Sequence, residues 1–293
     1  MKIFVQLSVG LTTMASVMAL QAAELPAPEY DVTKELIHLV SEATELVEAE
    51  GVEAACAEFR EPGRWFQGDS YVFMLDLEGK SLCHPARPAL EGQPLIELKD
   101  PQGKPIVQSF LREVEGDGDG GWVHYLWPQP DRLTFYWKTS YVRKVSIPGG
   151  GEVVVGSGLY EMPMERFFIV EQVNDAVDLI QEDKDAAFAL LRDRTTGFVF
   201  YDSYVFVLDS AGRMLVNAGF PQLEGTDVSE VRDISGKLLM SEMMSASDQS
   251  GHGWVSYDWP RPGSTLPAPK SSFVRRVIVG DEVLLVGAGV YFR

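Results

Sequence analysis

The stretch SYVFMLD at residues 70–76 returns as SYVFVLD at residues 203–209. Three more stretches return in the same order: GWVHYLWP (121–128) as GWVSYDWP (253–260), KTSYVR (138–143) as KSSFVR (270–275), and GSGLY (156–160) as GAGVY (287–291). The offset between the copies changes only from 133 to 131. We therefore expect one domain written twice, in which a residue kept by both copies serves the shared fold or a shared site.

Length and charge limit what the chain can be. Its 293 residues suffice for two domains of ordinary size, each able to bury its own core. With 25 basic and 43 acidic residues the net charge is −18, and this negative field argues against nucleic acid as a partner. The same field does not attract small anions, so an anion site would need a cation placed within it.

Residues 1–23 are expected to form a secretory signal peptide. Lys2 gives a positive start, an apolar run follows, and Ala22 and Ala23 stand before an acidic, proline-containing stretch. The alternative is an uncleaved membrane anchor, although hydroxyl and amide side chains interrupt the run. No later segment is apolar enough to cross a bilayer. We therefore expect a soluble periplasmic or secreted protein, with one domain at 30–162 and a second at 163–293.

The order of periodic segments predicts the fold class. Apolar residues at three- and four-residue steps predict helices at 36–47 and 167–180, with shorter helices at 52–59 and 186–191. Further helices are expected from Asp100 to about 114 and from Asp233 to about 245. Five strand-like segments complete the first copy, at 71–75, 81–84, 121–127, 135–145 and 152–160. We expect an α+β fold in which each copy is a five-stranded antiparallel sheet with helices laid over it.

Strand alternation gathers a repeated polar set on one face of each expected sheet. The set is Tyr71, Tyr125, Trp127 and Lys138 in the first copy, and Tyr204, Tyr257, Trp259 and Lys270 in the second. A lysine rarely enters an apolar face without an anionic partner, and an ammonium among phenol hydroxyls suits a small carboxylate. We therefore expect a ligand site. The alternative is an aromatic core along which the lysine reaches solvent.

Little else in the sequence carries chemistry. His84 ends a strand and is replaced by Asn217 in the second copy, so it is either a donor to a carboxylate or a hydrogen-bonded loop residue. The four histidines show no metal-ligand spacing, and no nucleophile motif, phosphate loop or dinucleotide fingerprint occurs. We expect no metal, no cofactor and no enzymatic activity.

The two cysteines allow two interpretations. An oxidising compartment would permit a disulfide between Cys56 and Cys83. The second copy has Phe or Leu near the first position and Val216 at the second. The comparison of the copies therefore favours two small core residues.

The combined motifs resemble a known family. The stretches YVFMLDLEG (71–79), LCHP (82–85), PALEG (88–92), GWVHYLWP (121–128) and KTSYV (138–142) are similar to the type-2 single Cache domain, found outside the membrane in bacterial chemoreceptors and sensor kinases. The resemblance implies two tandem PAS-like domains, each with a long N-terminal helix and a pocket for small ligands, often short organic acids. By motif position it implies a pocket lined by Lys138, Tyr71, Tyr125, Trp127, Tyr141 and His84. The second copy departs at Asn217 and at Phe273, which replaces Tyr141.

These expectations combine into one functional hypothesis. We expect an exported small-molecule sensor, relevant to signal transduction and chemotaxis, that recognises a short carboxylate such as pyruvate, lactate, acetate or propionate. With no membrane-crossing segment expected after the signal peptide, the signal would pass to a separate membrane receptor or kinase. The alternative is an interaction module without a ligand, whose helices at 31–50 and 165–181 form a homodimer or dock on a receptor.

Overall fold

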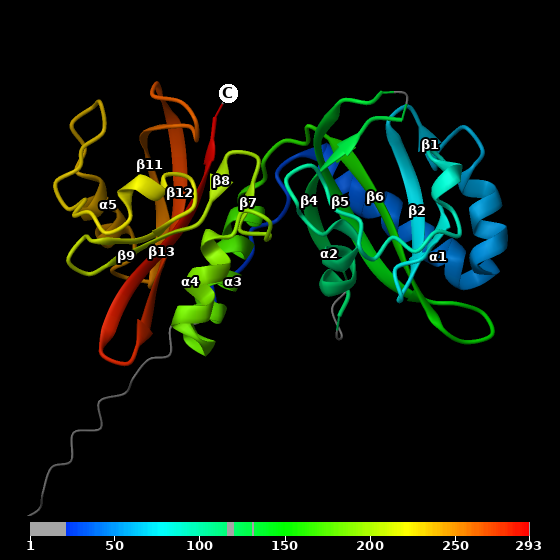
Figure 1. Ribbon diagram of the computed structural model, residues 1–293, viewed down its shortest axis with the longest axis horizontal. Helices are drawn as coiled ribbons and strands as arrows, with labels where there is room; N and C mark the ends of the chain where they lie inside the picture. Colours follow the sequence, from blue (N-terminus) through cyan, green and yellow to red (C-terminus); the bar gives the residue numbers. More distant parts are fainter. Residues whose placement is uncertain (1–21, 116–119, 131, 293) are drawn as a thin grey trace, which may run out of the picture.

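The computed structural model describes residues 22–115, 120–130 and 132–292. These residues form two halves that lie side by side along the long axis of the molecule (Figure 1). Each half contains one large antiparallel sheet with helices packed on it, which confirms the expected α+β class. The expected signal peptide falls almost entirely on residues 1–21, outside the described residues.

The first half runs from α1 to β6. Its elements are α1 (Asp31–Phe59), β1 (Phe66–Gln67), β2 (Ser70–Asp76), β3 (Ser81–Cys83), η1 (Pro88–Leu90), α2 (Ile106–Glu113), β4 (Gly121–Pro128), β5 (Phe135–Ser146) and β6 (Glu152–Tyr160). The sheet has the order β3-β2-β6-β5-β4, with β1 also paired to β2. The first and last long strands of this half, β2 and β6, therefore lie next to each other at the centre of the sheet.

The second half runs from α3 to β13 and repeats this order. Its elements are α3 (Arg166–Glu182), α4 (Lys184–Arg192), β7 (Val199–Phe200), β8 (Ser203–Tyr204), β9 (Phe206–Asp209), β10 (Met214–Asn217), η2 (Pro221–Leu223), α5 (Leu239–Ala246), β11 (His252–Pro260), β12 (Pro267–Val279) and β13 (Glu282–Tyr291). The sheet order is β10-β9-β13-β12-β11, while β7 and β8 form a separate two-stranded sheet.

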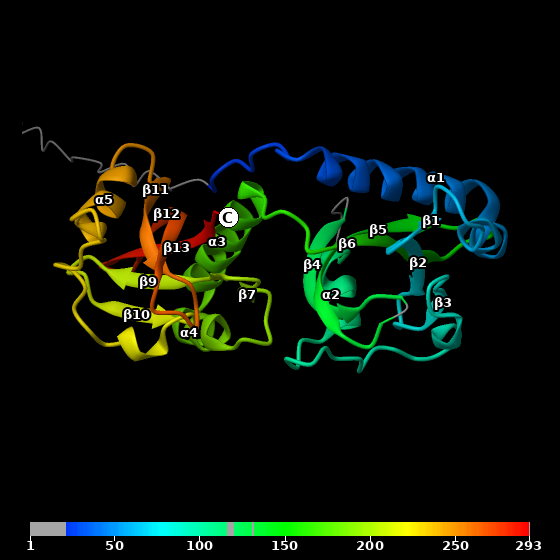
Figure 2. The ribbon, with the colours of Figure 1, turned by 90° about the horizontal axis from the view of Figure 1, so that it is seen from above.

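Successive side chains of β2 point to opposite faces of the sheet and belong to two different cores of the first half. Val72 and Met74 pack with α1 in one cluster of buried residues. Tyr71, Phe73 and Leu75 belong to a second cluster, which also contains the buried residues of α2. The long helix α1 thus covers one face of the sheet, and α2 with the chain that precedes it covers the other (Figure 2). The two-residue period predicted from the sequence is confirmed.

One helix prediction is confirmed and another needed correction. The expected helices at 36–47 and 52–59 are the two helical segments of α1, which a kink at Gly51 separates, where φ is 82° and ψ is 173°. The helix expected from Asp100 begins only at Ile106, because the Asp100 carboxylate accepts hydrogen bonds from the backbone of Gln102, Lys104 and Leu126 and so closes a turn. In the second half α5 likewise begins at Leu239, six residues after Asp233.

The segment before α1 lies against the second half rather than the first. The backbone of Ala23 exchanges two hydrogen bonds with the Asn174 side chain on α3. The fully buried Glu165 carboxylate accepts the backbone N–H groups of Glu29 and Tyr30 at 2.8 and 3.1 Å. This segment therefore connects the two halves a second time, alongside the chain between β6 and α3. Over the described ranges, no helix is both long and apolar enough to span a membrane.

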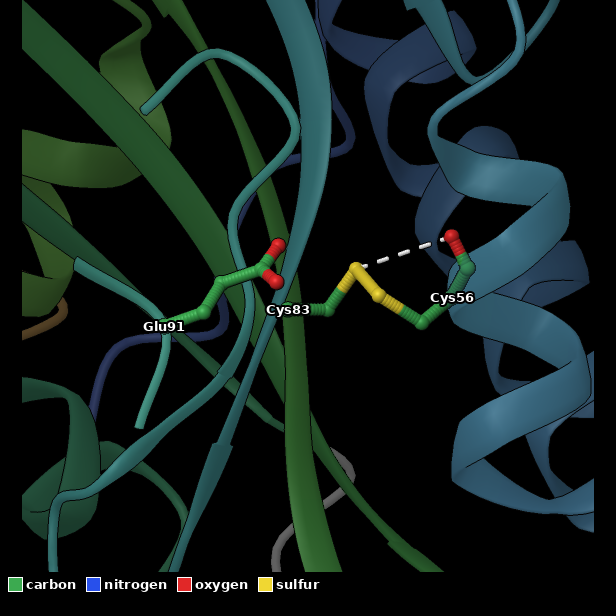
Figure 3. A group of neighbouring side chains, drawn as sticks. All are labelled: Cys56, Cys83 and Glu91. Atoms are coloured by element: carbon green, nitrogen blue, oxygen red, sulfur yellow. Dashed lines mark hydrogen bonds between the residues drawn. A yellow bond between two sulfur atoms is a disulfide. The ribbon is translucent and has the colours of Figure 1, made fainter. Parts of the chain in front are cut away.

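The interpretation of the cysteines as unpaired core residues is wrong. Cys56 near the end of α1 and Cys83 at the end of β3 form a disulfide with a Cα–Cα distance of 5.7 Å (Figure 3). Both residues are buried, and Val216 at the counterpart of Cys83 is buried too. The position is therefore a core position in both halves. Comparison of the copies identified the burial and missed a cross-link that only the first half has.

Removing this disulfide is expected to destabilise the protein. Closing a loop with a sequence separation of 27 stabilises a fold by about 3.5 kcal/mol, because the cross-link lowers the entropy of the unfolded chain. Dithiothreitol should therefore lower the Tm of the wild type. The variant Cys56→Ala/Cys83→Val should have a low Tm that does not respond to dithiothreitol. A wild-type Tm that is the same with and without reductant would contradict the cross-link.

Candidate ligand-binding site

The side chain of Lys138 lies in the interior of the first half. Strand β5 pairs Lys138 with Tyr125 on β4 and with Tyr160 on β6. The lysine is 0% exposed, and its Nζ atom is 3.8 Å from the ring centroid of Tyr71 and 5.0 Å from that of Tyr160. Nζ has no hydrogen-bond acceptor among the described residues. Burial lowers the pKa of Lys138 to about 7, with Asp69 opposing the shift and Arg87 adding to it.

A glycine on the neighbouring strand makes room for this side chain. Gly158 lies opposite Ser140 on β5, and a Cβ atom at Gly158 would come within 2.9 Å of Cε of Lys138. The Ser140 hydroxyl is in turn 2.9 Å from the Tyr125 hydroxyl. The second half repeats this arrangement with Gly289, whose added Cβ would come within 2.9 Å of Cε of Lys270. The repeated GSG and GAG motifs thus leave space for the lysine stem.

A cavity of about 30 Å³ lies beside the lysine. Its wall joins the face of β2 to the helix α2 and the loop after β3, and consists of Tyr71, Phe73, Leu75, His84, Leu90, Leu95, Leu98, Ile106, Val107, Phe110, Tyr125 and Trp127. Four expected site residues, Tyr71, His84, Tyr125 and Trp127, therefore meet around one space. Lys138 does not line it directly; its ammonium group covers the ring of Tyr71, which belongs to the wall.

Polar atoms on this wall are held in defined positions. Trp127 Nε1 donates to the Tyr71 hydroxyl at 3.1 Å, and the ring of His84 lies 4.9 Å from that of Tyr71. Nδ1 of His84 has no hydrogen-bond partner within the described part of the chain. Burial, and then the charge of Lys138, lower the pKa of His84 to about 3, so its ring is neutral at pH 7. Nζ of Lys138 and Nδ1 of His84 are thus two buried nitrogen atoms near this cavity that have no hydrogen-bond partner among the described residues.

Tyr141 needs a correction, because it lies on the opposite face of the sheet. Its ring is 4.8 Å from the ring of Trp122, which packs against Phe167 and Phe168 of α3. Tyr141 is three positions after Lys138 on β5, and side chains an odd number of positions apart in a strand point to opposite faces of the sheet. Tyr160, in contrast, was missed. The repeated GSGLY and GAGVY motifs place a tyrosine at the end of the last strand in both copies, and this signal could have identified it.

In the second half, the counterparts of Lys138 and His84 both make hydrogen bonds within the chain. Nζ of Lys270 donates to the Tyr204 hydroxyl at 3.0 Å and lies 4.1 Å from the centroid of that ring, and burial lowers the pKa of Lys270 to about 7. Asn217, at the counterpart of His84, accepts the backbone N–H of Phe220 at 2.8 Å. A cavity of about 40 Å³ is lined by Tyr204, Phe206, Leu208, Met214, Asn217, Val228, Val231, Leu239, Met240, Met243, Tyr257 and Trp259.

One potential metal-ligand group occurs in the described ranges. Ligand atoms of Cys56, Cys83 and Glu91 lie within 4.8 Å of one another (Figure 3). The two sulfur atoms are bonded to each other, so neither is a thiolate that could coordinate a metal. The Glu91 carboxylate instead accepts the backbone N–H of His84 at 2.9 Å and pairs with Arg60. The disulfide and the Glu91 carboxylate therefore hold the backbone at Cys83 and His84 in place.

A third, larger cavity of about 640 Å³ lies between the halves, and sequence reasoning did not find it. Carboxylates of both halves face it, with Glu113 from α2 and Glu171 from α3. Burial, together with neighbouring carboxylates such as Asp175, raises the pKa of Glu113 to about 7 and that of Glu171 to about 8. Both carboxyl groups are therefore partly or mostly protonated at neutral pH, and their ionisation in this cavity becomes unfavourable for the fold as the pH rises above 7.

Comparisons with known proteins agree with this architecture. The sequence profile described as a Cache domain matches residues 32–291. The methyl-accepting chemotaxis protein McpP of Pseudomonas putida is 31% identical over 91 residues, which cover 31% of this chain and 16% of that protein. The sensor histidine kinase MctS of Rhizobium johnstonii is 30% identical over 93 residues, covering 31% of this chain and 19% of that protein. The aligned regions therefore represent less than a fifth of either relative.

A solved structure described as the basis for carboxylic acid recognition by a Cache chemosensory domain is 28% identical. The match covers 45% of this chain and 94% of that chain, with a TM-score of 0.38.

Charge removal in the cavity between the halves should stabilise the protein in a pH-dependent way. The pKa of Glu171 is raised above that of the unfolded chain, so its ionisation destabilises the fold fully above pH 8 and not at all below about pH 4.5. Glu171→Gln should therefore raise Tm by about 3 °C at pH 8.5 and leave it unchanged at pH 4. Glu230→Gln, at an exposed position outside this cavity, is the control. A gain that is equal at both pH values would contradict the assignment.

Proposed function

The chain belongs to the Cache domain family, and from this premise we propose that it is an exported sensor protein that binds a short-chain carboxylate in its first half. Two tandem Cache domains, at 30–162 and 163–293, would follow a signal peptide at residues 1–23. The repeated motifs and the common strand order of the two sheets support the duplication. A receptor or kinase in the membrane would receive the signal.

One observation carries the proposal: Lys138 is a buried ammonium group without an acceptor among the described residues. Transfer of an ammonium into an apolar interior costs several kcal/mol unless a charge or a hydrogen-bond acceptor compensates for it. A carboxylate ligand supplies both. The rings of Tyr71 and Tyr160 already place the electron-rich faces of two phenols near Nζ, so a bound anion would complete a partly formed cation site.

The wall of the cavity supports a small ligand with an apolar part. Leu75, Phe73 and Phe110 provide apolar surface, and the Tyr71 and Tyr125 hydroxyl groups provide polar contacts. The neutral His84 ring offers Nδ1, which has no partner among the described residues, to a second polar atom of the ligand. Acetate, propionate, lactate and pyruvate combine one carboxylate with a short apolar part, and the last two add an oxygen atom that His84 could contact.

The proposal assigns different roles to the two halves. Lys270 already has the Tyr204 hydroxyl as an acceptor, and Asn217 is hydrogen-bonded to the chain. A ligand would have to replace these bonds before it gained any of its own. We therefore propose that Lys138, Tyr71, Tyr125, Trp127 and His84 form the high-affinity site. The set around Lys270 binds the same acids weakly or not at all.

The alternative, a dimerisation or docking module, has less support. Most apolar residues of α3 are buried, which leaves the segment 165–181 little free surface for a partner. A homodimer through α1 stays a prediction.

A thermal-shift panel with the four acids tests the proposal. A ligand at 100 times its Kd stabilises the folded state by about 2.7 kcal/mol, so Tm should rise by several degrees for at least one acid. Lys138→Met should abolish the rise and increase the Tm of the unliganded protein, because it removes a buried charge that has no acceptor in the described ranges. Lys270→Met is the matched control and should keep the response. If no acid shifts Tm, or if Lys138→Met responds like the wild type, the proposal fails.

The affinity for a carboxylate should fall as the pH rises above 7, because Lys138 must be protonated to bind it. Without ligand the pKa of Lys138 is about 7, and a bound carboxylate raises that pKa. Above pH 7 binding therefore requires uptake of a proton, and Kd should rise by about tenfold for each pH unit between 7 and 9. Isothermal titration in buffers of different ionisation enthalpy measures both Kd and the proton uptake. A constant Kd over this range would exclude the ammonium as the binding group.

A further inference from the structure

We propose that the hairpin Val199–Tyr204 of the second half couples the Lys138 site to the Lys270 site, so that a ligand bound in the first half changes the conformation of the second. The inference rests on the proposed function, because the ligand is the carboxylate assigned to Lys138. Figure 1 shows β7 and β8, the strands of this hairpin, on the side of the second half that faces β4 and β5.

The hairpin contacts the residues that flank Lys138 on its own strand. Trp137 and Thr139 point to the face of β5 opposite to Lys138. The ring of Tyr201 stacks on that of Trp137, with the centroids 5.0 Å apart and the planes at 24°. The Tyr201 hydroxyl is 3.2 Å from Oγ1 of Thr139. A single residue of the second half thus contacts both neighbours of the lysine.

His124 on β4 and Lys104 before α2 also contact the hairpin. His124 pairs with Thr139 across the strands, and its Nδ1 lies 2.9 Å from Oγ1 of Thr139. The ring of His124 stacks on Phe200 of the hairpin, with centroids 4.0 Å apart at an angle of 11°. Lys104, only 4% exposed, donates from Nζ to the backbone carbonyl of Val199. The hairpin is therefore fixed to the first half through side chains of three separate segments.

The other end of the hairpin reaches the second ammonium group. Tyr204 pairs with Val199 in the hairpin ladder. Its hydroxyl accepts the hydrogen bond from Lys270 at 3.0 Å, and its ring lies 4.1 Å from Nζ of that lysine. A continuous series of contacts therefore runs from Lys138 through Trp137 and Thr139 to Tyr201, and from there along the hairpin to Lys270.

Tyr201 supplies the element that can change state. Its φ angle is 49°, in the left-handed region that non-glycine residues rarely adopt. Tyr201 is the first residue of the two-residue turn between β7 and β8, where a positive φ is typical, and its side chain stacks on Trp137 and contacts Thr139. A ligand that draws Lys138 away from Tyr71 moves the side chains of β5 on both faces. The hairpin then loses or gains the contacts of Tyr201 with Trp137 and Thr139.

Hydrogen exchange of the full chain tests the coupling without a ligand as well as with one. Lys138→Met alone should change the exchange rates of the amides at 199–204 by about 2- to 30-fold, the range of coupling along packed networks. Lys144→Met, on the same strand but at the other end of the sheet, is the control and should leave these amides unchanged. Unaltered exchange at 199–204 in Lys138→Met would overturn the coupling, whether or not any ligand binds.

The second part of the experiment repeats these measurements after addition of sodium acetate or sodium pyruvate. Either acid, if it raises Tm, should also change exchange at 199–204 in the wild type. Tyr201→Ala should retain the Tm rise and lose the exchange response, while Tyr201→Phe, which keeps the stack on Trp137, should retain part of that response. If neither acid shifts Tm, the proposed function fails and the Lys138→Met comparison still decides the coupling. A Tm rise with an undiminished exchange response in Tyr201→Ala would refute the role of Tyr201.

Discussion

Each half is organised around an ammonium group inside an apolar sheet. An uncompensated charge in such a place is unfavourable, so the residues around it act to make it tolerable. Phenol rings lie next to Lys138 and Lys270, and a glycine on the adjacent strand provides the space for each lysine stem. Burial lowers the pKa of both lysines to about 7, so each is close to losing its proton at neutral pH. Strand pairing sets the aromatic residues beside each lysine, and the repeated glycine motifs leave space for its side chain.

The two copies solve the same electrostatic problem differently. Nζ of Lys270 donates to the Tyr204 hydroxyl, whereas Nζ of Lys138 has no acceptor in the described part of the chain. The two lysine environments thus differ by one hydrogen bond: Nζ of Lys270 has it, and Nζ of Lys138 does not.

Alternation and repetition in the sequence predicted the strands, their faces and the burial of the lysines, because both follow from the two-residue period of a strand. The start of α2 was not predictable in this way: an aspartate that begins a helix and one that closes a turn make the same kind of hydrogen bond, and Asp100 closes a turn. Tyr141 was assigned by resemblance against the parity of its own strand. The disulfide was missed because Val216 showed only that its position is buried. Contacts between the halves, such as Trp137 with Tyr201, depend on the tertiary arrangement and leave no local pattern.

The cross-link between Cys56 and Cys83 also bears on how the protein matures. It joins the long helix to the residue immediately before His84, and the carboxylate of Glu91 holds the His84 backbone from the other side. Before the cysteines are oxidised, this covalent restraint on the segment that carries His84 is absent, and the hydrogen bond to Glu91 holds the His84 backbone without it.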